Sequence, residues 1–295
     1  MTTTWTSPRS CVGSRRPVVS DNRHRDGVLV PVPILFRGAI AIGCAARGGF
    51  AWGVLVVRIR RVVTTREGGS SRPPFDSFNL GGKVGDDPEA VSANQRKLAR
   101  GVGLDEDRLV WMEQIHGRNA ATVEQPRSSA VEASDALVTA EPDLALVVLT
   151  ADCVPVLLGD PVSGVVSAVH AGRVGARIGV LVSALRAMRD AGAQLDRVEA
   201  LLGPAACGAC YEVPEAMQAD VEEHLPGSAC KTRSGTTGLD LRAGLWEQLA
   251  AAGIGRIGLD PRCTVESREL FSHRRDGART GRIAGVIWAE PEESE

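Results

Sequence analysis

Residues 144–175, LALVVLTADCVPVLLGDPVSGVVSAVHAGRVG, decide the fold of this chain. Apolar runs rich in β-branched residues predict buried strands over Leu144–Leu149, Val154–Leu158 and Val165–Val169. The first two runs flank Thr150-Ala151-Asp152-Cys153, and the third ends at His170-Ala171-Gly172, after which a helix is expected. Because α/β proteins place reactive side chains where strands end in glycine-bearing turns, this stretch predicts both a core and a site.

The flanking sequence continues the alternation of strands and helices. Asp87-Pro88-Glu89 is typical of a helix start, and this helix is expected to end near Gly103. Further helices are expected over residues 176–191, 214–223 and 241–252, and strands from near residue 54 and over 122–124, 135–139, 198–202, 257–259 and 281–288. Asp276-Gly277 predicts a tight turn. One α/β domain is expected over residues 54–290, with mixed sheets layered between helices.

Composition narrows the class of protein. The net charge of −2 argues against a general nucleic-acid binder, which normally carries a basic stripe. An aromatic content of 4% disfavours stacking on single strands, and 43% hydrophobic residues can supply a substantial core. Seven cysteines lack the density of a secreted disulfide scaffold, so reduced thiols in the cytoplasm are expected.

The two ends of the chain differ from the rest. Residues 1–53 are expected to be disordered or a misassigned N-terminal extension, and residues 291–295 an acidic tail. Val28–Val57 is apolar, but Arg37 and Arg47 leave runs of about nine residues, against roughly 20 for a membrane-spanning helix. No membrane association is expected.

His116, Cys153 and His170 are the candidate metal ligands. Catalytic zinc sites use three protein ligands drawn from His, Cys and carboxylate, and keep a fourth position open. Spacings of 37 and 17 residues suit such a site without being diagnostic, and packed core or surface side chains are the alternative. Cys207-x-x-Cys210 also suggests zinc or redox chemistry. Because no second C-x-x-C accompanies it, we interpret this pair as two half-buried thiols.

A series of segments occurs in order: NLGGKVGDDPEAV, EQIHG, DALVT, LTADCVPVLL, AVHAG, LLGP followed by CYEV, and SHRRDG followed by TGR. Together they closely resemble the YfiH-like family, once called multicopper polyphenol oxidases or laccase-domain proteins, from about Val57 to Trp288. The resemblance implies an α/β/β/α sandwich that is also similar to a cysteine-hydrolase architecture.

The resemblance also implies an activity. Members of the family are described as purine nucleoside phosphorylases acting on adenosine, inosine and S-methyl-5′-thioadenosine, which also deaminate adenosine. His116, Cys153 and His170 match the family's metal-binding positions, so zinc is the expected cofactor, with copper possible. Zinc activates water, as deamination requires. The expected partners are purine nucleosides and phosphate. No nucleic-acid partner is expected, and the protein is expected to be a monomer or a homodimer.

Four further residues are expected at this site. Arg66 and Arg274 are candidate phosphate contacts, because guanidinium meets phosphate oxygens bidentately. Asp152 is expected to transfer protons or orient a ligand, and Asn79 to contact substrate, since a polar side chain between Phe78 and Leu80 needs a partner. The alternatives are solvated turn charges for the arginines and a turn-stabilising role for Asp152.

Other functions stay open. In a cysteine hydrolase or amidase, Cys153 would be the nucleophile and His170 its base, and alkylation rather than chelation would inhibit it. Copper-dependent phenol oxidation ranks last, because several coppers need many histidines and the chain has five. A non-enzymatic role in peptidoglycan quality control is the remaining alternative. The family commonly has HAGWRG where this chain has HAGRVG, which bears on substrate range or turnover.

Overall fold

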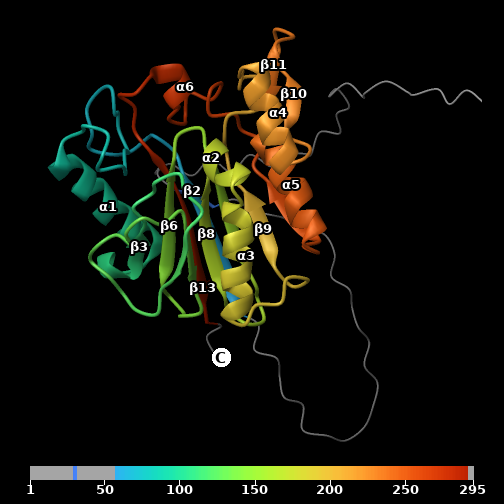
Figure 1. The fold of residues 1–295 in the computed structure, drawn as a ribbon. Helices are drawn as coiled ribbons and strands as arrows, with labels where there is room; N and C mark the ends of the chain where they lie inside the picture. The colour runs from blue at the N-terminus through green and yellow to red at the C-terminus, as the bar shows by residue number, and fades with distance from the viewer. Residues whose placement is uncertain (1–28, 32–56, 292–295) are drawn as a thin grey trace, which may run out of the picture.

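The structure is a computed structural model that describes residues 29–31 and 57–291. Within these residues, two mixed sheets form the centre of the molecule, with strand orders β1-β2-β13-β6-β3 and β12-β9-β7-β8-β5-β4. Figure 1 shows the strands between α1 on one side and α3 on the other. This is the expected α/β/β/α layering. The predictions for residues 1–53 and 291–295 lie almost entirely outside the described residues.

The bounds of the elements are as follows. The first sheet contains β1 (Leu29–Pro31), β2 (Arg58–Thr64), β13 (Ile283–Glu290), β6 (Ala145–Thr150) and β3 (Leu109–Trp111). The second contains β12 (Arg256–Leu259), β9 (Glu199–Leu202), β7 (Val154–Gly159), β8 (Val166–Ala171), β5 (Ala136–Thr139) and β4 (Ala120–Thr122), while β10 (Ala229–Lys231) and β11 (Thr237–Leu239) pair separately. The helices are α1 (Pro88–Val102), α2 (Arg173–Arg177), α3 (Val180–Asp190), α4 (Glu215–His224), α5 (Leu241–Ala251) and α6 (His273–Asp276).

The two sheets pack face to face through an inner apolar core. Leu146 and Val148 of β6 belong to the same buried cluster as Leu157 of β7 and Val166 and Ala168 of β8. Side chains alternate between the two faces of a strand, so every second residue of each strand enters this core. Both faces of these strands are buried, which explains their continuous apolar sequence.

Helices cover the outer face of each sheet. Leu98 of α1 packs with Val147 and Trp288 on the first sheet. Leu181 of α3 and Leu245 of α5 pack in the buried cluster on the second. Truncating any of these leucines to alanine is expected to cost about 2–5 kcal/mol, because the cavity left behind is only partly refilled.

Helix α1 begins and ends where its sequence indicates. The Asp87 carboxylate accepts a hydrogen bond from the backbone N–H of Glu89 at 3.0 Å, and Pro88 is the first helical residue. At the other end, Gly103 adopts φ 78°, a left-handed conformation that favours glycine.

Three local predictions are wrong. The helix expected over residues 176–191 is broken into α2 and α3, because Gly179 adopts φ 87° and cannot continue a helix. The tight turn expected at Asp276-Gly277 is instead the end of α6, whose N-cap Ser272 accepts a hydrogen bond from the N–H of Arg275. The strand expected over residues 122–124 is β4, two residues earlier, in register with β5.

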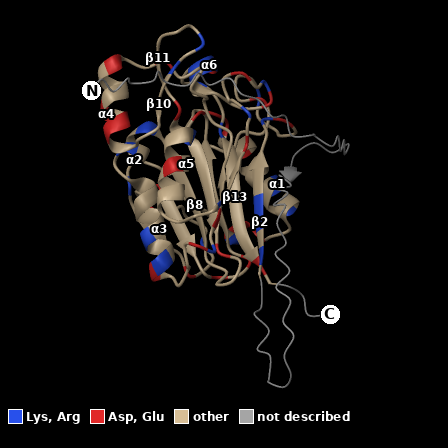
Figure 2. Cartoon of the chain, turned by 90° about the vertical axis from the view of Figure 1, so that its right-hand side faces the viewer, with Lys and Arg blue, Asp and Glu red and all other residues tan. Residues whose placement is uncertain are grey.

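Charges of both signs are interspersed over the face that carries α3 and α4 (Figure 2). Acidic residues lie along α4, while basic and acidic residues lie together at the end of α3 (Figure 2). Among the residues that the structure describes, no helix is long and apolar enough to cross a membrane.

Candidate active site

The predicted metal ligands meet at one edge of the two sheets. Cys153 lies in the short connection between β6 and β7, His170 is near the end of β8, and His116 lies in the loop after β3. His170 follows Val166 and Ala168 at two-residue spacing, so its ring is on the inner side of the second sheet. The strand pairing β7–β8 sets Pro155 opposite His170 and brings Cys153 beside it.

The three side chains form a compact group. Nε2 of His116 lies 4.0 Å from Sγ of Cys153, and the His116 and His170 rings are 4.7 Å apart, edge to face at 82°. One potential ligand atom from each of the three residues lies within 4.8 Å of the others. His170 is buried and His116 is exposed, so the group is anchored in the protein interior at His170 and reaches solvent at His116.

Asp135 orients this group, and sequence reasoning missed it. Its Oδ1 lies 2.8 Å from Nδ1 of His170, which leaves Nε2 of that ring available to the site. The same carboxylate accepts hydrogen bonds from the backbone N–H groups of His116 at 3.0 Å and Gly117 at 2.7 Å. The only signal in the sequence is an acidic residue at the start of an apolar strand. Such outer contacts fix the tautomer and direction of a metal-binding histidine.

The electrostatics of the group favour a thiolate. Burial opposes ionisation of Cys153, but the charges and hydrogen bonds of His170 and His116 outweigh it and lower the pKa of Cys153 to about 6. Burial likewise opposes protonation of His170, but Cys153 and Asp135 raise its pKa to about 9. Without a cation, the pair is therefore a thiolate beside an imidazolium, and a bound metal would displace the imidazolium proton.

The donor set and the space around it fit a zinc ion. Two imidazole nitrogens and one thiolate are the ligands that zinc prefers, and they leave one side open. Gly172, directly after β8, keeps that space free. A Cβ at this position would lie 3.0 Å from Cδ2 of His116 and 3.1 Å from Sγ of Cys153. Copper also accepts this donor set.

Asp152 links the metal-ligand loop to the segment around α6. Its Oδ1 accepts a hydrogen bond from the hydroxyl of Thr264 at 2.6 Å, and its Oδ2 accepts one from the backbone N–H of Arg274 at 2.6 Å. Asp152 and His116 adopt φ 89° and 58°, conformations that non-glycine residues rarely take. Residues with such strained backbone conformations cluster at functional sites.

Two arginines close to the group form no ion pair with another described residue. The guanidinium of Arg274 lies 4.8 Å from the centre of the Tyr211 ring, and no ion pair between described residues involves Arg274 or Arg173. Burial raises the pKa of Tyr211, and the positive charges of Arg173 and Arg274 oppose that rise. Arg173 and Tyr211 are further residues that sequence reasoning did not assign to the site.

The other two predicted residues are engaged in structural contacts. Arg66 pairs with Asp76 at 3.2 Å, lies 3.9 Å from Asp276, and stacks on Phe271 at 4.7 Å. Asn79 is fully buried. Its Oδ1 accepts hydrogen bonds from the backbone N–H groups of Gly81 and Arg282, and its Nδ2 donates to Asp86. Both residues support loops of the protein, while Arg274 donates its backbone N–H to Asp152 and Arg173 directly follows Gly172.

The departure from HAGWRG falls at the rim of the site. Arg173 is the first residue of α2, where the family commonly has tryptophan, and it lies beside Tyr211. Val174 replaces the common arginine and is 40% exposed. The chain therefore has its guanidinium at the first residue of α2.

Two facing mixed sheets with a His, Cys, His group at one edge define a layered α/β protein with a candidate metal-dependent site. Residues 60–290 match the family described as multi-copper polyphenol oxidoreductase laccase, and the chain belongs to this family. It is 57% identical over 238 residues to a purine nucleoside phosphorylase of Mycobacterium tuberculosis, covering 81% of this chain and 95% of the relative. It is 54% identical over 236 residues to a purine nucleoside phosphorylase of Corynebacterium glutamicum, covering 79% and 96%.

Solved structures agree with the sequence relatives. The hypothetical protein YfiH of Bacillus licheniformis superimposes with a TM-score of 0.73 at 33% identity, covering 78% of this chain and 92% of that one. YlmD from Geobacillus stearothermophilus gives a TM-score of 0.73 at 33% identity, covering 79% and 92%. The predicted family and fold are therefore confirmed.

Proposed function

We propose that this protein is a zinc-dependent purine nucleoside phosphorylase that also deaminates adenosine. The observation that carries the proposal is the pairing of a metal-competent group, His116, Cys153 and His170, with the guanidinium groups of Arg173 and Arg274. The names of relatives 54–57% identical to the chain support the same substrate class. The substrates would be adenosine, inosine and S-methyl-5′-thioadenosine, with phosphate.

In phosphorolysis, a phosphate oxygen bonds to C1′ of the ribose as the bond from C1′ to N9 of the purine breaks. The electron pair of that bond goes to the purine, which leaves as an anion and takes up a proton. Arg274 and Arg173 are suited to hold phosphate, because neither forms an ion pair with another described residue and guanidinium binds phosphate bidentately. The products are the free base and ribose 1-phosphate, or its methylthio derivative.

The remaining residues would position the reacting groups. His116, Cys153 and His170 would hold the zinc ion, which when bound supplies Lewis acidity. Asp152 would keep Arg274 and Thr264 at the site through its two short hydrogen bonds, and its carboxylate, next to Cys153 in the sequence, would move a proton during deamination. In that reaction water adds at C6 of adenine and ammonia leaves. Arg66 and Asn79 would act through the loops they support.

The direct test is mass spectrometry of adenosine incubated with zinc-loaded protein, with and without phosphate. Phosphate-dependent adenine and ribose 1-phosphate are expected, and phosphate-independent inosine would establish the deaminase. Cys153→Ala should abolish both products, while Cys230→Ser, which removes a thiol outside the group, should abolish neither. Adenosine that stays intact with the zinc-loaded protein would refute the proposal.

A cysteine hydrolase is the second candidate, because Cys153, His170 and Asp135 also form a Cys-His-Asp arrangement. The 2.8 Å contact between Asp135 and His170, and the thiolate favoured at Cys153, are what a nucleophilic cysteine requires. Chelation distinguishes the two candidates. Chelation would abolish the zinc-dependent activity and spare a hydrolase, whereas the hydrolase would remain active without metal until Cys153 is alkylated.

A further inference from the structure

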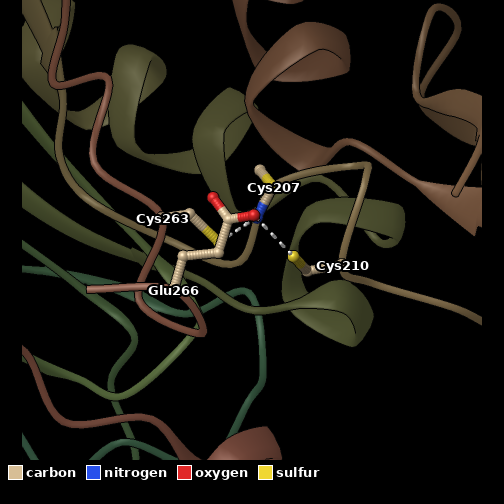
Figure 3. A group of neighbouring side chains, drawn as sticks. All are labelled: Cys207, Cys210, Cys263 and Glu266. Carbon is tan, nitrogen blue, oxygen red and sulfur yellow. Dashed lines mark hydrogen bonds between the residues drawn. The ribbon is translucent and has the colours of Figure 1, made fainter. Parts of the chain in front are cut away.

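A second group of side chains that could bind a metal lies in two loops next to the candidate active site. Cys207, Cys210, Cys263 and Glu266 each offer one ligand atom, and these atoms all lie within 4.8 Å of one another. Figure 3 shows the three sulfur atoms and the Glu266 carboxylate pointing toward one another. Residues 207–210 follow β9 and residues 263–266 follow β12, and these two strands are parallel neighbours.

The four ligands come from two similar turns. In the first, the N–H of Cys210 donates to the carbonyl of Cys207 at 2.9 Å, and in the second the N–H of Glu266 donates to the carbonyl of Cys263 at 3.2 Å. Each turn therefore presents its first and fourth residues on the same side, as C-x-x-C and C-x-x-E. The C-x-x-C spacing is that of structural zinc sites, and carboxylate oxygen is also a zinc ligand.

Backbone hydrogen bonds hold the two turns together. Ala205 and Cys263 form a parallel bridge, and the N–H of Thr264 donates to the carbonyl of Ala205 at 3.1 Å. The N–H of Cys207 donates to Sγ of Cys263 at 3.4 Å (Figure 3). A backbone donor of this kind stabilises a thiolate, the form in which cysteine binds metal.

A cation would also relieve the crowding of these groups. Sγ of Cys210 lies 3.5 Å from Oε1 of Glu266, and that carboxylate also pairs with the exposed Arg233. Burial and the neighbouring thiols Cys207 and Cys263 raise the pKa of Cys210. Three sulfurs and one carboxylate oxygen are a complete tetrahedral donor set, with no position left for water, so the group suits a structural rather than a catalytic metal.

We propose that Cys207, Cys210, Cys263 and Glu266 bind a second, structural zinc ion. Tetrahedral zinc with bonds of about 2.3 Å to sulfur places its ligand sulfurs roughly 3.8 Å apart, so the ligand atoms need to approach by no more than about 1 Å. Glu266 would exchange its ion pair with Arg233 for the metal, and each cysteine would release its thiol proton.

This zinc ion would clamp two loops that face the candidate active site. Cys210 precedes Tyr211, whose ring lies under the guanidinium of Arg274. Cys263 precedes Thr264, which donates a hydrogen bond to Asp152. The second zinc ion would therefore join the two loops that contact Arg274 and Asp152 of the candidate active site. The proposal does not depend on the enzyme's substrate.

The test is zinc content and cobalt spectroscopy of the full chain purified under reducing conditions. Wild-type protein should bind about two zinc ions, and both His116→Ala/His170→Ala and Cys207→Ser/Cys210→Ser should bind about one, as each variant removes one of two independent sites. With cobalt, the intense near-ultraviolet thiolate band should be lost mainly in the cysteine variant, because that group supplies three sulfurs and the other supplies one.

Matched variants keep the test decisive. Cys230→Ser removes a nearby thiol, whose Sγ lies 3.5 Å from the carbonyl of Gly208, and should leave the second zinc in place. Glu266→Gln should fold and bind zinc about 10-fold or more weakly, since a neutral amide oxygen replaces a carboxylate ligand. Retention of the first zinc by Cys207→Ser/Cys210→Ser would show that this variant is folded.

Two outcomes would overturn the proposal. One is a wild-type protein that binds the same amount of zinc as Cys207→Ser/Cys210→Ser. The other is a disulfide between Cys207 and Cys210, found by peptide mass spectrometry in zinc-supplemented protein purified in air without added reductant, which would identify a redox pair. Either result is independent of whether adenosine is a substrate.

Discussion

Asp135 accepts from Nδ1 of His170 at 2.8 Å, and the same buried carboxylate anchors the backbone of the loop that carries His116. One residue directly before β5 therefore sets the position of two of the three candidate metal ligands. Asp135 does not itself reach the open side of the group. Its role is to hold one ring nitrogen and one loop so that the remaining nitrogens meet Cys153.

Replacing Asp135 with asparagine should weaken zinc binding about 10- to 100-fold, the usual effect of losing such an outer contact. The asparagine keeps the shape but loses the charge that fixes the His170 tautomer. Competition with a coloured chelator measures the affinity. The matched control is Asp160→Asn, another buried aspartate that accepts backbone hydrogen bonds, from Val162 and Gln194, but touches no ligand. Equal losses of zinc affinity in the two variants would contradict this role.

Alkylation of Cys153 in metal-free protein should follow its lowered pKa of about 6. The reactive thiolate forms as pH rises through that value, so the rate should climb between about pH 5 and 7 and then level off, whereas an ordinary thiol climbs near pH 8.5. Iodoacetamide labelling and peptide mass spectrometry measure this profile. His170→Ala should move the profile to higher pH, because it removes a positive charge beside the sulfur, and added zinc should protect Cys153.

Arg274→Ala and Arg173→Ala should each lower kcat/KM for phosphate about 10- to 100-fold. Loss of a hydrogen bond between charged groups costs about 1.5–3 kcal/mol. Steady-state kinetics at fixed adenosine, with phosphate varied, measures the effect. Arg256→Ala serves as a control, because that exposed arginine pairs with Glu199 at 3.0 Å on β9 and does not contact the site. Unchanged phosphate kinetics in both site variants would remove these arginines from the proposed binding site.

Gly172→Ala should weaken zinc binding without unfolding the protein. The backbone of Gly172 has φ −74°, which alanine adopts readily, but its Cβ would crowd His116 and Cys153 at 3.0 and 3.1 Å. Isothermal titration with zinc measures the affinity, and circular dichroism checks the fold. Gly82→Ala is the control, since a Cβ there meets nothing within 4 Å. If Gly172→Ala binds zinc as tightly as wild type, the space next to Gly172 is not needed for zinc binding.

The stability contributed by Asp160 should depend on pH in one direction. Burial opposes its ionisation, but hydrogen bonds from the N–H groups of Gln194 and Val162 outweigh it and lower its pKa. A lowered folded-state pKa means that the contribution is full above the unfolded value of about 3.9 and is lost as pH falls through the folded value. Asp160→Asn should therefore be about 2 kcal/mol less stable at pH 7. In urea unfolding, the difference should shrink below pH 4; a constant difference would contradict the ionic origin.

The helices and strands that depend on residues close together in the sequence were predicted correctly in most cases. The strand over Val154–Leu158 and the helix starting after Asp87 are confirmed, because continuous apolar runs and N-capping depend on neighbours in the chain. The predicted helix over residues 176–191 failed for a local reason that the apolar period hides. Its spacing continues through Gly179, but the backbone there turns left-handed.

The sequence by itself determined the family, the apolar strands and the His116, Cys153 and His170 set, because each is carried by residue types at short spacing or by matching motifs. Only the tertiary structure decided which polar residues join them. Asp135 reaches His170, and Cys263 and Glu266 reach Cys207 and Cys210, because parallel and antiparallel pairing brings distant turns to one edge. Hydrogen bonds and metal ligation act over a few ångströms in space, and strand order, rather than spacing along the chain, sets those distances.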